Sequence, residues 1–437
     1  MKNIHFEESV DSPLDILRVL LVAIFAGVLI GIIGGAFGAT LHFLAIQFIA
    51  FIAYLHSVDG VWFIPGFLIT ALITSICVGI SRWLVQLEPS TKGSGIQHVE
   101  AVMHGDAKPS KFTALPIKFF GGLLSIGSGM VLGKEGPTVQ IAAVIGSECG
   151  KLFRLKTADQ SLLYTAVAGT GLSVAFNAPL SGIAFSVEEI AKKISMKRLM
   201  ISFAAVASGM ITDRSFFGNS IEFVVGDLLP DSGVTLCFYV LFSVVLSLIA
   251  ILYSRTIIGA LNVTDSIPTL SPVTKAMLIG FGVGLFAYFY PNFVGGGDVQ
   301  VQSILSKDYF LLPLISLMAV RFFLGPICYS TGVPGGIFSP ILLVGSSIGV
   351  VFVLLLNPLL TQIGLAQLDS ISFAVVGMAG FFIVVVRAPL TGILLATEMS
   401  GKVSLMTPLL ITAVICVCIP ILLKQEPIYD ALRNRQG

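Results

Sequence analysis

Long apolar stretches separated by short polar loops run through almost the whole chain. They lie near residues 16–55, 61–86, 115–132, 137–149, 161–190, 199–217, 232–260, 273–294, 309–328, 335–360, 371–399 and 404–423. A full crossing of a bilayer needs a helix of about 20 apolar residues. Because the stretches differ in length, they predict tilted and interrupted helices rather than uniform rods. The pattern predicts an all-α polytopic membrane protein.

The composition strengthens this prediction and excludes a water-soluble globule. Of the 437 residues, 55% are hydrophobic and only 11% are charged, against about 25% charged in an ordinary soluble domain. The 45 glycines and 20 prolines indicate broken helices, whose freed backbone groups need other partners inside lipid. The net charge of +1 lacks the basic excess with which proteins bind nucleic acid, so we expect no such partner.

Charges in the loops predict how the chain is inserted in the membrane. Four basic residues cluster between 192 and 198, and the positive-inside rule places this loop in the cytoplasm. Residues 1–15 are then expected to be a cytoplasmic segment and 218–231 an extracytoplasmic loop. Residues 425–437 are expected to be a cytoplasmic tail, which is too short for a folded regulatory domain.

The chain also repeats itself. Three motifs recur at offsets of 203, 203 and 210 residues: Lys118-Phe119-Phe120 as Arg321-Phe322-Phe323, Gly133–Pro137 (GKEGP) as Gly336–Pro340 (GIFSP), and 178–183 (APLSGI) as 388–393 (APLTGI). They define two homologous membrane repeats, 16–217 and 232–424. Transport proteins commonly use two such halves in inverted topology, with the substrate site at their interface.

Three glycine-rich motifs interrupt the apolar stretches: GSGIQ at 93–97, GKEGP at 133–137 and GGIFSP at 335–340. Each places flexible glycine before a restarting helix, whose first N–H groups are unpaired and carry the positive end of the helix dipole. Several such ends meeting at mid-membrane would bind an anion. The alternative is that the glycines only allow helices to pack closely. Their matched places in two halves favour the anion site.

Two side chains in these motifs are candidates for chemistry. Ser94 can donate to a halide or cap a helix. Glu135 lies at a helix start between apolar stretches, where burying an ionised carboxylate is costly. When ionised it would occupy a helix N-terminus, and when protonated it would leave, so that proton binding would open the site to another anion. The alternative for Glu135 is an ion pair with Lys134.

The remaining titratable residues give less specific signals. Glu188 and Glu189 end an apolar stretch beside the basic loop, where each is a proton-entry group or a member of a surface salt bridge. The cysteines and histidines show no metal-ligand spacing, and no catalytic constellation indicates an enzyme. We therefore expect a transporter without a cofactor or metal.

Together the motifs resemble those of the CLC family of chloride channels and chloride/proton antiporters. That family carries GSGIP, G(K/R)EGP and GxFxP, which stand here as GSGIQ, GKEGP and GIFSP. The resemblance extends over FNAPLSGIAFSVEE at 176–189 and roughly over residues 16–435. It implies a homodimer of the bacterial inner membrane, with a separate pathway for chloride in each subunit and inverted repeats of broken helices.

The resemblance also implies roles for single residues. Glu135 matches the family's gating glutamate, and Glu189 matches its internal proton-transfer glutamate, which favours Glu189 over Glu188. The anion site would consist of the Ser94 hydroxyl and backbone amides of the three motifs, at Ser94, Gly95, Gly133, Lys134, Glu135, Gly136, Gly336, Ile337 and Phe338.

Two positions depart from the family pattern. Gln97 replaces the usual proline of the first motif. The tyrosine whose hydroxyl binds the central anion is expected near the last span, where the alignment puts Val403, and none occurs between Tyr329 and Tyr429. The leading hypothesis is chloride/proton exchange. The missing phenol leaves a chloride channel or a loosely coupled anion carrier as the alternative.

Overall fold

The computed structural model describes residues 12–58, 64–219, 221–229, 233–306 and 309–435, so most of the predicted N-terminal segment lies outside the described residues. The helices of the first half are α1 (Pro13–Ser57), α2 (Gly66–Leu87), α3 (Ile96–His104), α4 (Ala114–Gly127), α5 (Glu135–Leu152), α6 (Thr157–Ala166), α7 (Ala168–Phe176), α8 (Pro179–Phe185) and α9 (Met196–Phe217). Those of the second half are α10 (Gly233–Asp265), α11 (Pro272–Phe289), α12 (Asp298–Ser306), α13 (Leu311–Ser330), α14 (Phe338–Gln362), α15 (Ser370–Val386), α16 (Pro389–Ser400) and α17 (Met406–Leu422). A last helix, α18 (Ile428–Asn434), follows them.

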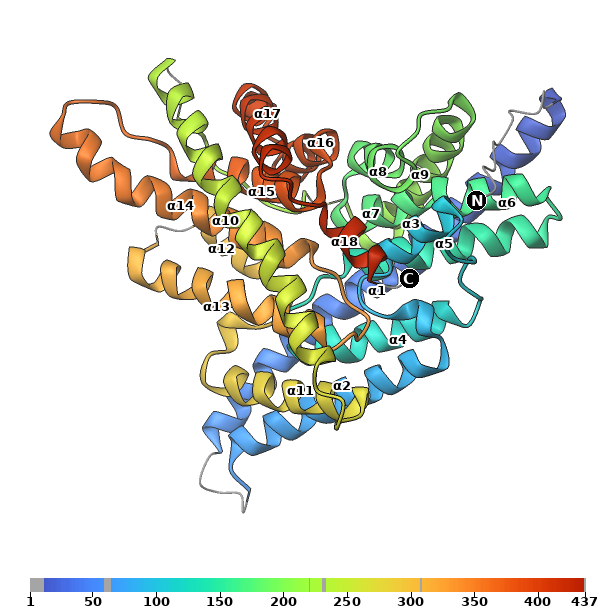
Figure 1. Ribbon diagram of the computed structural model, residues 1–437, viewed down its shortest axis with the longest axis horizontal. Coiled ribbons are helices and arrows are strands. Elements are labelled where there is room, and N and C mark those ends of the chain that lie inside the picture. Colours follow the sequence, from blue (N-terminus) through green and yellow to red (C-terminus); the bar gives the residue numbers. More distant parts are fainter. Residues whose placement is uncertain (1–11, 59–63, 220, 230–232, 307–308, 436–437) are drawn as a thin grey trace.

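The two halves follow the same order of elements, except that α6 and α7 of the first half stand where the second half has the single helix α15 (Figure 1). They meet at an antiparallel bridge between the equivalent glycines Gly133 and Gly336. The N–H of each glycine donates to the carbonyl of the other at 2.7 Å. Equivalent segments therefore run in opposite directions where they touch, as inverted repeats require. The predicted fold class, an all-α membrane protein of inverted repeats with broken helices, is confirmed.

Two predicted apolar stretches, 161–190 and 371–399, are broken in the structure. Asn177 ends α7 and Arg387 ends α15, with left-handed φ angles of +51° and +71°. In each case a proline two positions later begins the next helix. Proline fits the first turn because its missing N–H would have no partner inside the helix. The repeated APLSGI and APLTGI motifs therefore encode matching helix breaks.

The helices that follow these breaks are capped across the repeats. Glu188 accepts two backbone N–H bonds and one hydroxyl bond, of 2.7 to 2.9 Å, at the start of α16. Glu398 accepts the equivalent set, of 2.5 to 2.9 Å, at the start of α8. Each carboxylate lies at the positive end of the other half's helix, where an anion is stabilising. Glu188 is thus a helix cap rather than a surface salt bridge.

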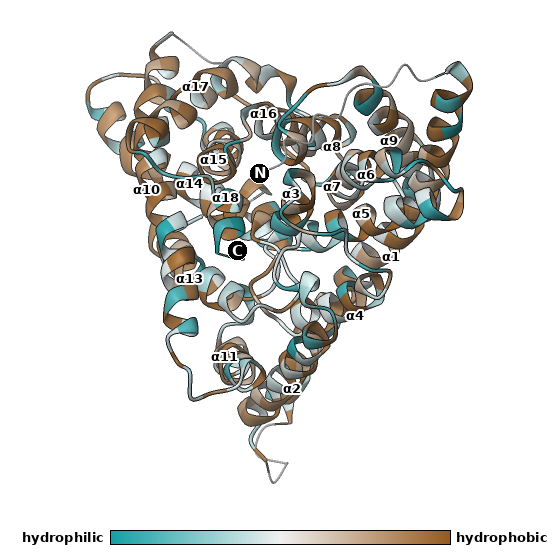
Figure 2. Cartoon of the chain, turned by 45° about the vertical axis from the view of Figure 1, so that its right-hand side comes forward, coloured by the Kyte–Doolittle hydropathy of each residue, from teal (hydrophilic) through white to brown (hydrophobic). Residues whose placement is uncertain are grey.

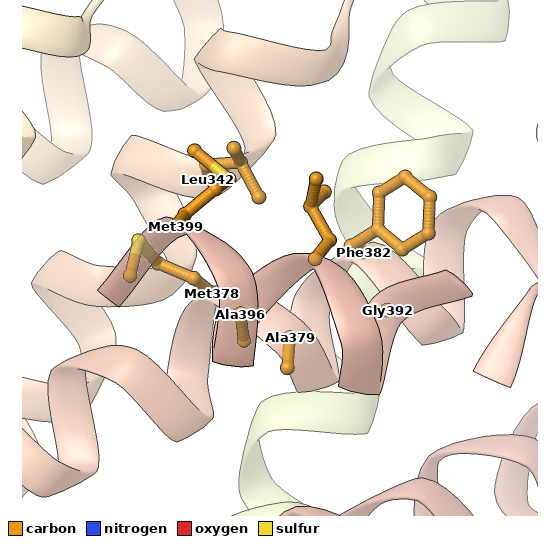
Figure 3. Close-up of a pocket in the computed structure, with 8 residues that line it drawn as sticks. Leu342, Met378, Ala379, Phe382, Gly392, Ala396 and Met399 are labelled. Atoms are coloured by element: carbon orange, nitrogen blue, oxygen red, sulfur yellow. The ribbon is translucent and has the colours of Figure 1, made fainter. Parts of the chain in front are cut away.

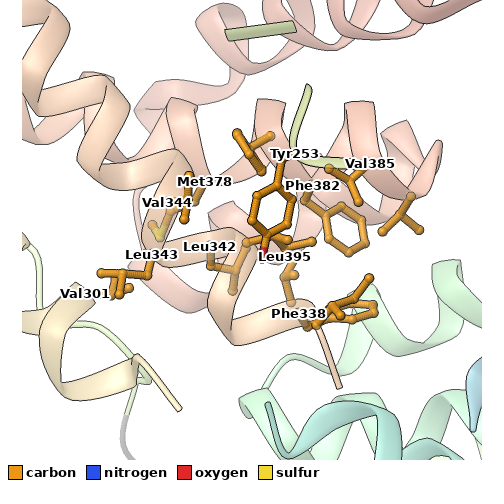
Figure 4. Packing of buried hydrophobic residues seen from close by; sticks show 14 of the residues in the cluster. Tyr253, Val301, Phe338, Leu342, Leu343, Val344, Met378, Phe382, Val385 and Leu395 are labelled. Atoms are coloured by element: carbon orange, nitrogen blue, oxygen red, sulfur yellow. The ribbon is translucent and has the colours of Figure 1, made fainter. Parts of the chain in front are cut away.

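Seven helices among the described residues are long and apolar enough to cross a membrane: α1, α2, α10, α11, α13, α14 and the helix at Val403–Leu422. Hydrophobic residues, brown in Figure 2, make up much of these helices, and many of their large apolar side chains are exposed. Of the seven, α14 is the most deeply buried. Figure 4 shows its first residue, Phe338, in a cluster with Phe382 of α15 and Tyr253 of α10. The start of α14 is therefore enclosed by the core.

Close packing of α14 against α15 yields a testable prediction. A Cβ on Gly349 would lie 2.1 Å from the carbonyl oxygen of Phe373, which is backbone and cannot turn aside. We expect Gly349→Ala to destabilise the protein by about 1–3 kcal/mol through overpacking. The measurement is the melting temperature of the purified protein in detergent.

Gly259→Ala on α10 is the matched control, because no atom lies within 4 Å of its added Cβ. There the substitution should be neutral or stabilising by up to about 1 kcal/mol, since alanine favours helix over glycine. Equal melting temperatures for the two variants would contradict the packing argument.

Candidate anion site

Three helices begin beside the Gly133–Gly336 bridge without a side-chain cap: α3 after Gly95, α5 after Lys134 and α14 after Ile337. In contrast, α1, α9, α11 and α15 each begin with a serine or aspartate whose side chain accepts a backbone N–H bond. A buried helix start without a cap leaves N–H donors unpaired at the positive end of the dipole. The capped helices and the uncapped ones therefore differ in what their first turns can bind.

The glycines bring these helix starts into contact. A Cβ on Gly136 would lie 2.2 Å from the Ser94 hydroxyl oxygen, and a Cβ on Gly336 would lie 3.1 Å from the Gly136 nitrogen. Gly95 has φ +91° and has the Gln140 side chain directly against its Cα. The structure thus brings together the residues that the sequence predicted, all of them buried except for the partly buried Lys134: Ser94, Gly95, Gly133, Lys134, Glu135, Gly136, Gly336, Ile337 and Phe338.

A tyrosine, Tyr429, does lie at the candidate anion site. Its side chain on α18 is fully buried, its ring centroid is 6.3 Å from that of Phe338, and its hydroxyl lies beside that of Ser94. Val403, by contrast, is 68% exposed. The prediction that Val403 replaces the central tyrosine is therefore wrong.

The physical reason for this error is the path of the C-terminal segment. After α17 the chain turns back, and α18 packs against α3 and α15 near the middle of the molecule (Figure 2). The segment expected to be only a tail carries a site residue. Spacing along α16 and α17 could not reveal this, because the tyrosine arrives from a separate helix.

The hydroxyl oxygens of Ser94 and Tyr429 are both buried, and neither makes a hydrogen bond within the part of the chain that the structure describes. Leaving a buried polar group unpaired costs about 1–3 kcal/mol. Two such donors beside uncapped helix starts form a place suited to a ligand that only accepts hydrogen bonds. A small anion has this property.

Two buried basic side chains hold the loops that precede the short helices α3 and α12. Lys118 Nζ donates to the carbonyl oxygens of Thr91 (2.9 Å) and Gly93 (2.6 Å), directly before Ser94. In the second half, Arg321 donates to two carbonyl oxygens of the equivalent loop, at 2.6 and 2.8 Å. The sequence repeat KFF/RFF indicated this pair of basic residues, although the sequence analysis assigned no role to Lys118.

Glu135 is the first residue of α5, and its buried carboxyl group turns toward the first turn of α14. There it is hydrogen-bonded to the Ser339 hydroxyl, and its second oxygen lies against Gly133. The Lys134 side chain extends elsewhere, to Glu222 at 3.3 Å and Asp298 at 3.7 Å. Among the described residues it makes no ion pair with Glu135, so the alternative reading of Glu135 is not supported.

Glu189 lies on a π-helical turn, Ser186–Ala191, and faces away from its neighbour Glu188. It is 2% exposed, and its carboxyl group lies next to that of Glu100, which is fully buried on α3. π-Helical turns are frequent at functional sites. Two ionised carboxylates this close repel each other, so the pair is suited to holding a proton. Sequence reasoning missed Glu100, because only the fold brings α3 to this turn.

Charged residues surround this acid pair on its outer side. Lys192 pairs with Asp430 at 2.8 Å, and Arg433 lies 3.9 Å from Glu100. Burial lowers the pKa of Lys192, but Glu100, Glu189 and Asp430 outweigh burial and raise it above its usual value. Lys192 therefore stays protonated near neutral pH and acts as a fixed charge.

A small pocket lies behind the site, between α14, α15 and α16 (Figure 3). Its lining is apolar and includes Leu342, Met378, Phe382 and Met399. Such a lining has no group that favours an anion over water. The pocket does not extend the candidate site.

A family model described as voltage gated chloride channel matches residues 76–420. The chain belongs to this family. This chain is also 32% identical to the H(+)/Cl(-) exchange transporter ClcA of Vibrio parahaemolyticus over 428 residues, which cover 95% of this chain and 89% of the relative. For the transporter of the same name from Vibrio cholerae the identity is 33% with the same coverage. Together with the seven apolar helices, these bacterial relatives identify a multi-pass integral protein of the inner membrane.

Solved structures agree with this assignment. The structure of a slow cyanobacterial Cl⁻/H⁺ antiporter superposes on this chain with a TM-score of 0.89 at 29% identity. The match covers 98% of this chain and 99% of the antiporter chain. A eukaryotic CLC transporter gives 0.81 at 19% identity, covering 97% and 75%. At that identity the second likeness shows the fold alone.

The tether at Lys118 yields a prediction. We expect Lys118→Met to lower the melting temperature and to weaken chloride binding, because two buried carbonyl groups lose their donor and the Ser94 loop is released. Each unpaired carbonyl should cost about 1–3 kcal/mol. Calorimetry of chloride binding and thermal melting measure both effects. Lys111→Met is the control, since Lys111 is exposed, and equal chloride affinity in both variants would contradict the tether.

Proposed function

We propose that this protein exchanges chloride for protons across the inner membrane, with a separate pathway in each subunit of a homodimer. The observation that carries the proposal is the meeting of three uncapped helix starts with the unpaired hydroxyls of Ser94 and Tyr429. The names of the relatives, H(+)/Cl(-) exchange transporters, support the same exchange.

Chloride is bound without a cation in direct contact. The proposed ligands are the hydroxyls of Ser94 and Tyr429 and backbone amides around Gly133–Gly136 and Gly336–Phe338. Dipoles and hydroxyl donors act more strongly on an anion in a buried site than in water, because little solvent screens them. Their partial charges also let the anion leave, which transport requires.

Glu135 is the proposed gate. Its ionised carboxylate and a chloride ion compete for the same helix starts, since both are anions stabilised by the same N–H groups. A protonated, neutral Glu135 loses that attraction and yields the place to chloride. One side chain thereby links proton binding to anion movement.

Glu189 is the proposed proton-transfer residue on the cytoplasmic side. It lies three to nine residues before the basic residues of the loop 192–198 and is paired with Glu100 in a buried position. The reason for considering a channel or a loosely coupled carrier was the missing tyrosine at Val403. With Tyr429 beside Ser94 that reason no longer holds, and Glu189 favours exchange.

The proposed homodimer uses the surface around α8 and α16. These helices cap each other's halves and expose the equivalent residues Leu180 (51%) and Leu390 (54%). A two-fold partner would cover this apolar surface. The other exposed apolar helix faces would contact membrane lipid.

Proton coupling gives the first test of the proposed function. In proteoliposomes, chloride and pH electrodes read together should show that a chloride gradient drives uphill proton movement. We expect Glu135→Gln to abolish proton movement, because an amide does not titrate, and Glu189→Gln to stop protons while sparing chloride flux. Glu148→Gln, which changes an acid paired with Lys151 on the surface, is the control. Proton pumping that persists in Glu135→Gln would exclude Glu135 as the gate.

Chloride affinity gives the second test. Tyr429→Phe and Ser94→Ala each remove one hydroxyl donor, and we expect each to weaken chloride binding by roughly tenfold, the equivalent of about 1.4 kcal/mol. Titration calorimetry measures the affinity. Tyr290→Phe is the matched control, because Tyr290 is 54% exposed. Unchanged affinity in both site variants would refute the proposed ligands.

A further inference from the structure

A hydroxyl group links the buried Glu135 to a second carboxylate that reaches the surface. Ser339 Oγ is hydrogen-bonded to Glu135 Oε1 and lies 2.9 Å from Asp298 Oδ1. Glu135 is fully buried, whereas the Asp298 side chain is 34% exposed. The three residues come from the first turns of α5, α14 and α12, so the fold alone brings them together.

The number of protons on this chain of groups is limited. A serine hydroxyl has a single proton and can donate to only one of the two carboxyl groups at a time. For both contacts to be hydrogen bonds, the other carboxyl group must be protonated and donate to Ser339 Oγ. The arrangement is therefore complete when the two carboxyl groups share one proton between them.

We propose that Asp298 and Ser339 form the route by which protons pass between Glu135 and the extracytoplasmic solution. Protonated Asp298 gives its proton to Ser339 Oγ while Ser339 passes its own proton to Glu135. After this step Asp298 is ionised, Glu135 is neutral and the Ser339 hydroxyl is restored. Asp298 then takes a proton from water, and the reverse sequence releases one. The relay rests on the proposed function of Glu135 as a proton-driven gate.

The surrounding charges suit Asp298 to this role. Lys134 Nζ lies 3.7 Å from Asp298 and 3.3 Å from Glu222, so the ionised Asp298 left after transfer faces a cation. Arg321 also attracts Asp298 electrostatically, and His42 attracts Glu222 in the same way. Glu222 lies in the predicted extracytoplasmic loop, one helix beyond the basic loop, so the relay opens opposite to Glu189.

The test uses the full-length protein in proteoliposomes with both electrodes. We expect Ser339→Ala and Asp298→Asn to lower proton turnover by about tenfold, because water would have to replace a positioned proton carrier. Ser339→Thr keeps a hydroxyl and should retain most of the proton turnover. Glu222→Gln is the matched control, because Glu222 shares Lys134 with Asp298 but lies outside the hydrogen-bonded chain; its proton turnover should stay near that of the unchanged protein.

Repeating the Ser339→Ala substitution in the Glu135→Gln variant distinguishes a role of Ser339 in proton transfer from a structural role. In Glu135→Gln no proton step remains, so adding Ser339→Ala should leave chloride flux unchanged. A fall in chloride flux there, or unchanged proton turnover in the single Ser339→Ala and Asp298→Asn variants, would overturn the relay. If the unchanged protein moved no protons under a chloride gradient, the proposed function itself would fail and the relay with it. If Ser339→Ala and Asp298→Asn lose proton turnover while the unchanged protein still exchanges chloride for protons, the result supports the relay and leaves the role of Glu135 as the gate unaffected.

Discussion

Unpaired backbone N–H groups at buried helix starts are the feature on which the rest of this structure depends. In a membrane, a helix that begins inside the protein leaves donors that neither lipid nor water can satisfy. At α1, α9, α11 and α15, serine and aspartate side chains solve this problem, and at α8 and α16 the carboxylates of Glu398 and Glu188 solve it across the repeats. At α3, α5 and α14 no side-chain cap is present. In the proposed site, these three helix starts, which meet beside the Gly133–Gly336 bridge, bind the anion.

The two-fold relation between the halves makes this arrangement possible. The Gly133–Gly336 bridge lies where the halves meet, and each half supplies a buried basic side chain that holds the loop before its short helix. In the proposed site neither Lys118 nor Arg321 contacts the anion, because both side chains are hydrogen-bonded to backbone carbonyl groups. A chain with so few charges therefore employs its buried basic side chains as tethers, and in the proposed site backbone dipoles supply the attraction for the anion.

In the proposed mechanism, a single carboxylate connects anion and proton movement. Glu135 begins a helix whose dipole favours its ionised form, while its burial opposes ionisation. These opposing effects make a carboxyl group responsive to its local proton supply. Acidic groups lie on both sides of it: Glu189 with Glu100 toward the basic loop, and Asp298 through Ser339 on the opposite side. In this mechanism acidic side chains carry protons to Glu135, whereas backbone amides and hydroxyls bind chloride. Separate groups for the two ions are a condition for exchanging one for the other.

Local sequence determined the features that depend on neighbouring residues. Apolar stretches predicted the membrane helices, proline and glycine predicted where helices break, and the repeated motifs predicted two halves and most of the site, from Ser94 to Phe338. The tertiary structure alone decided which distant residues join that site. Tyr429, Glu100 and Asp298 lie on the short helices α18, α3 and α12, and Ser339 lies in the first turn of α14; packing between elements far apart in the chain brings them to the site. Val403 was a wrong choice for the same reason, since spacing along one helix contains no information about a side chain that a later helix, folded back over the core, brings to the same place.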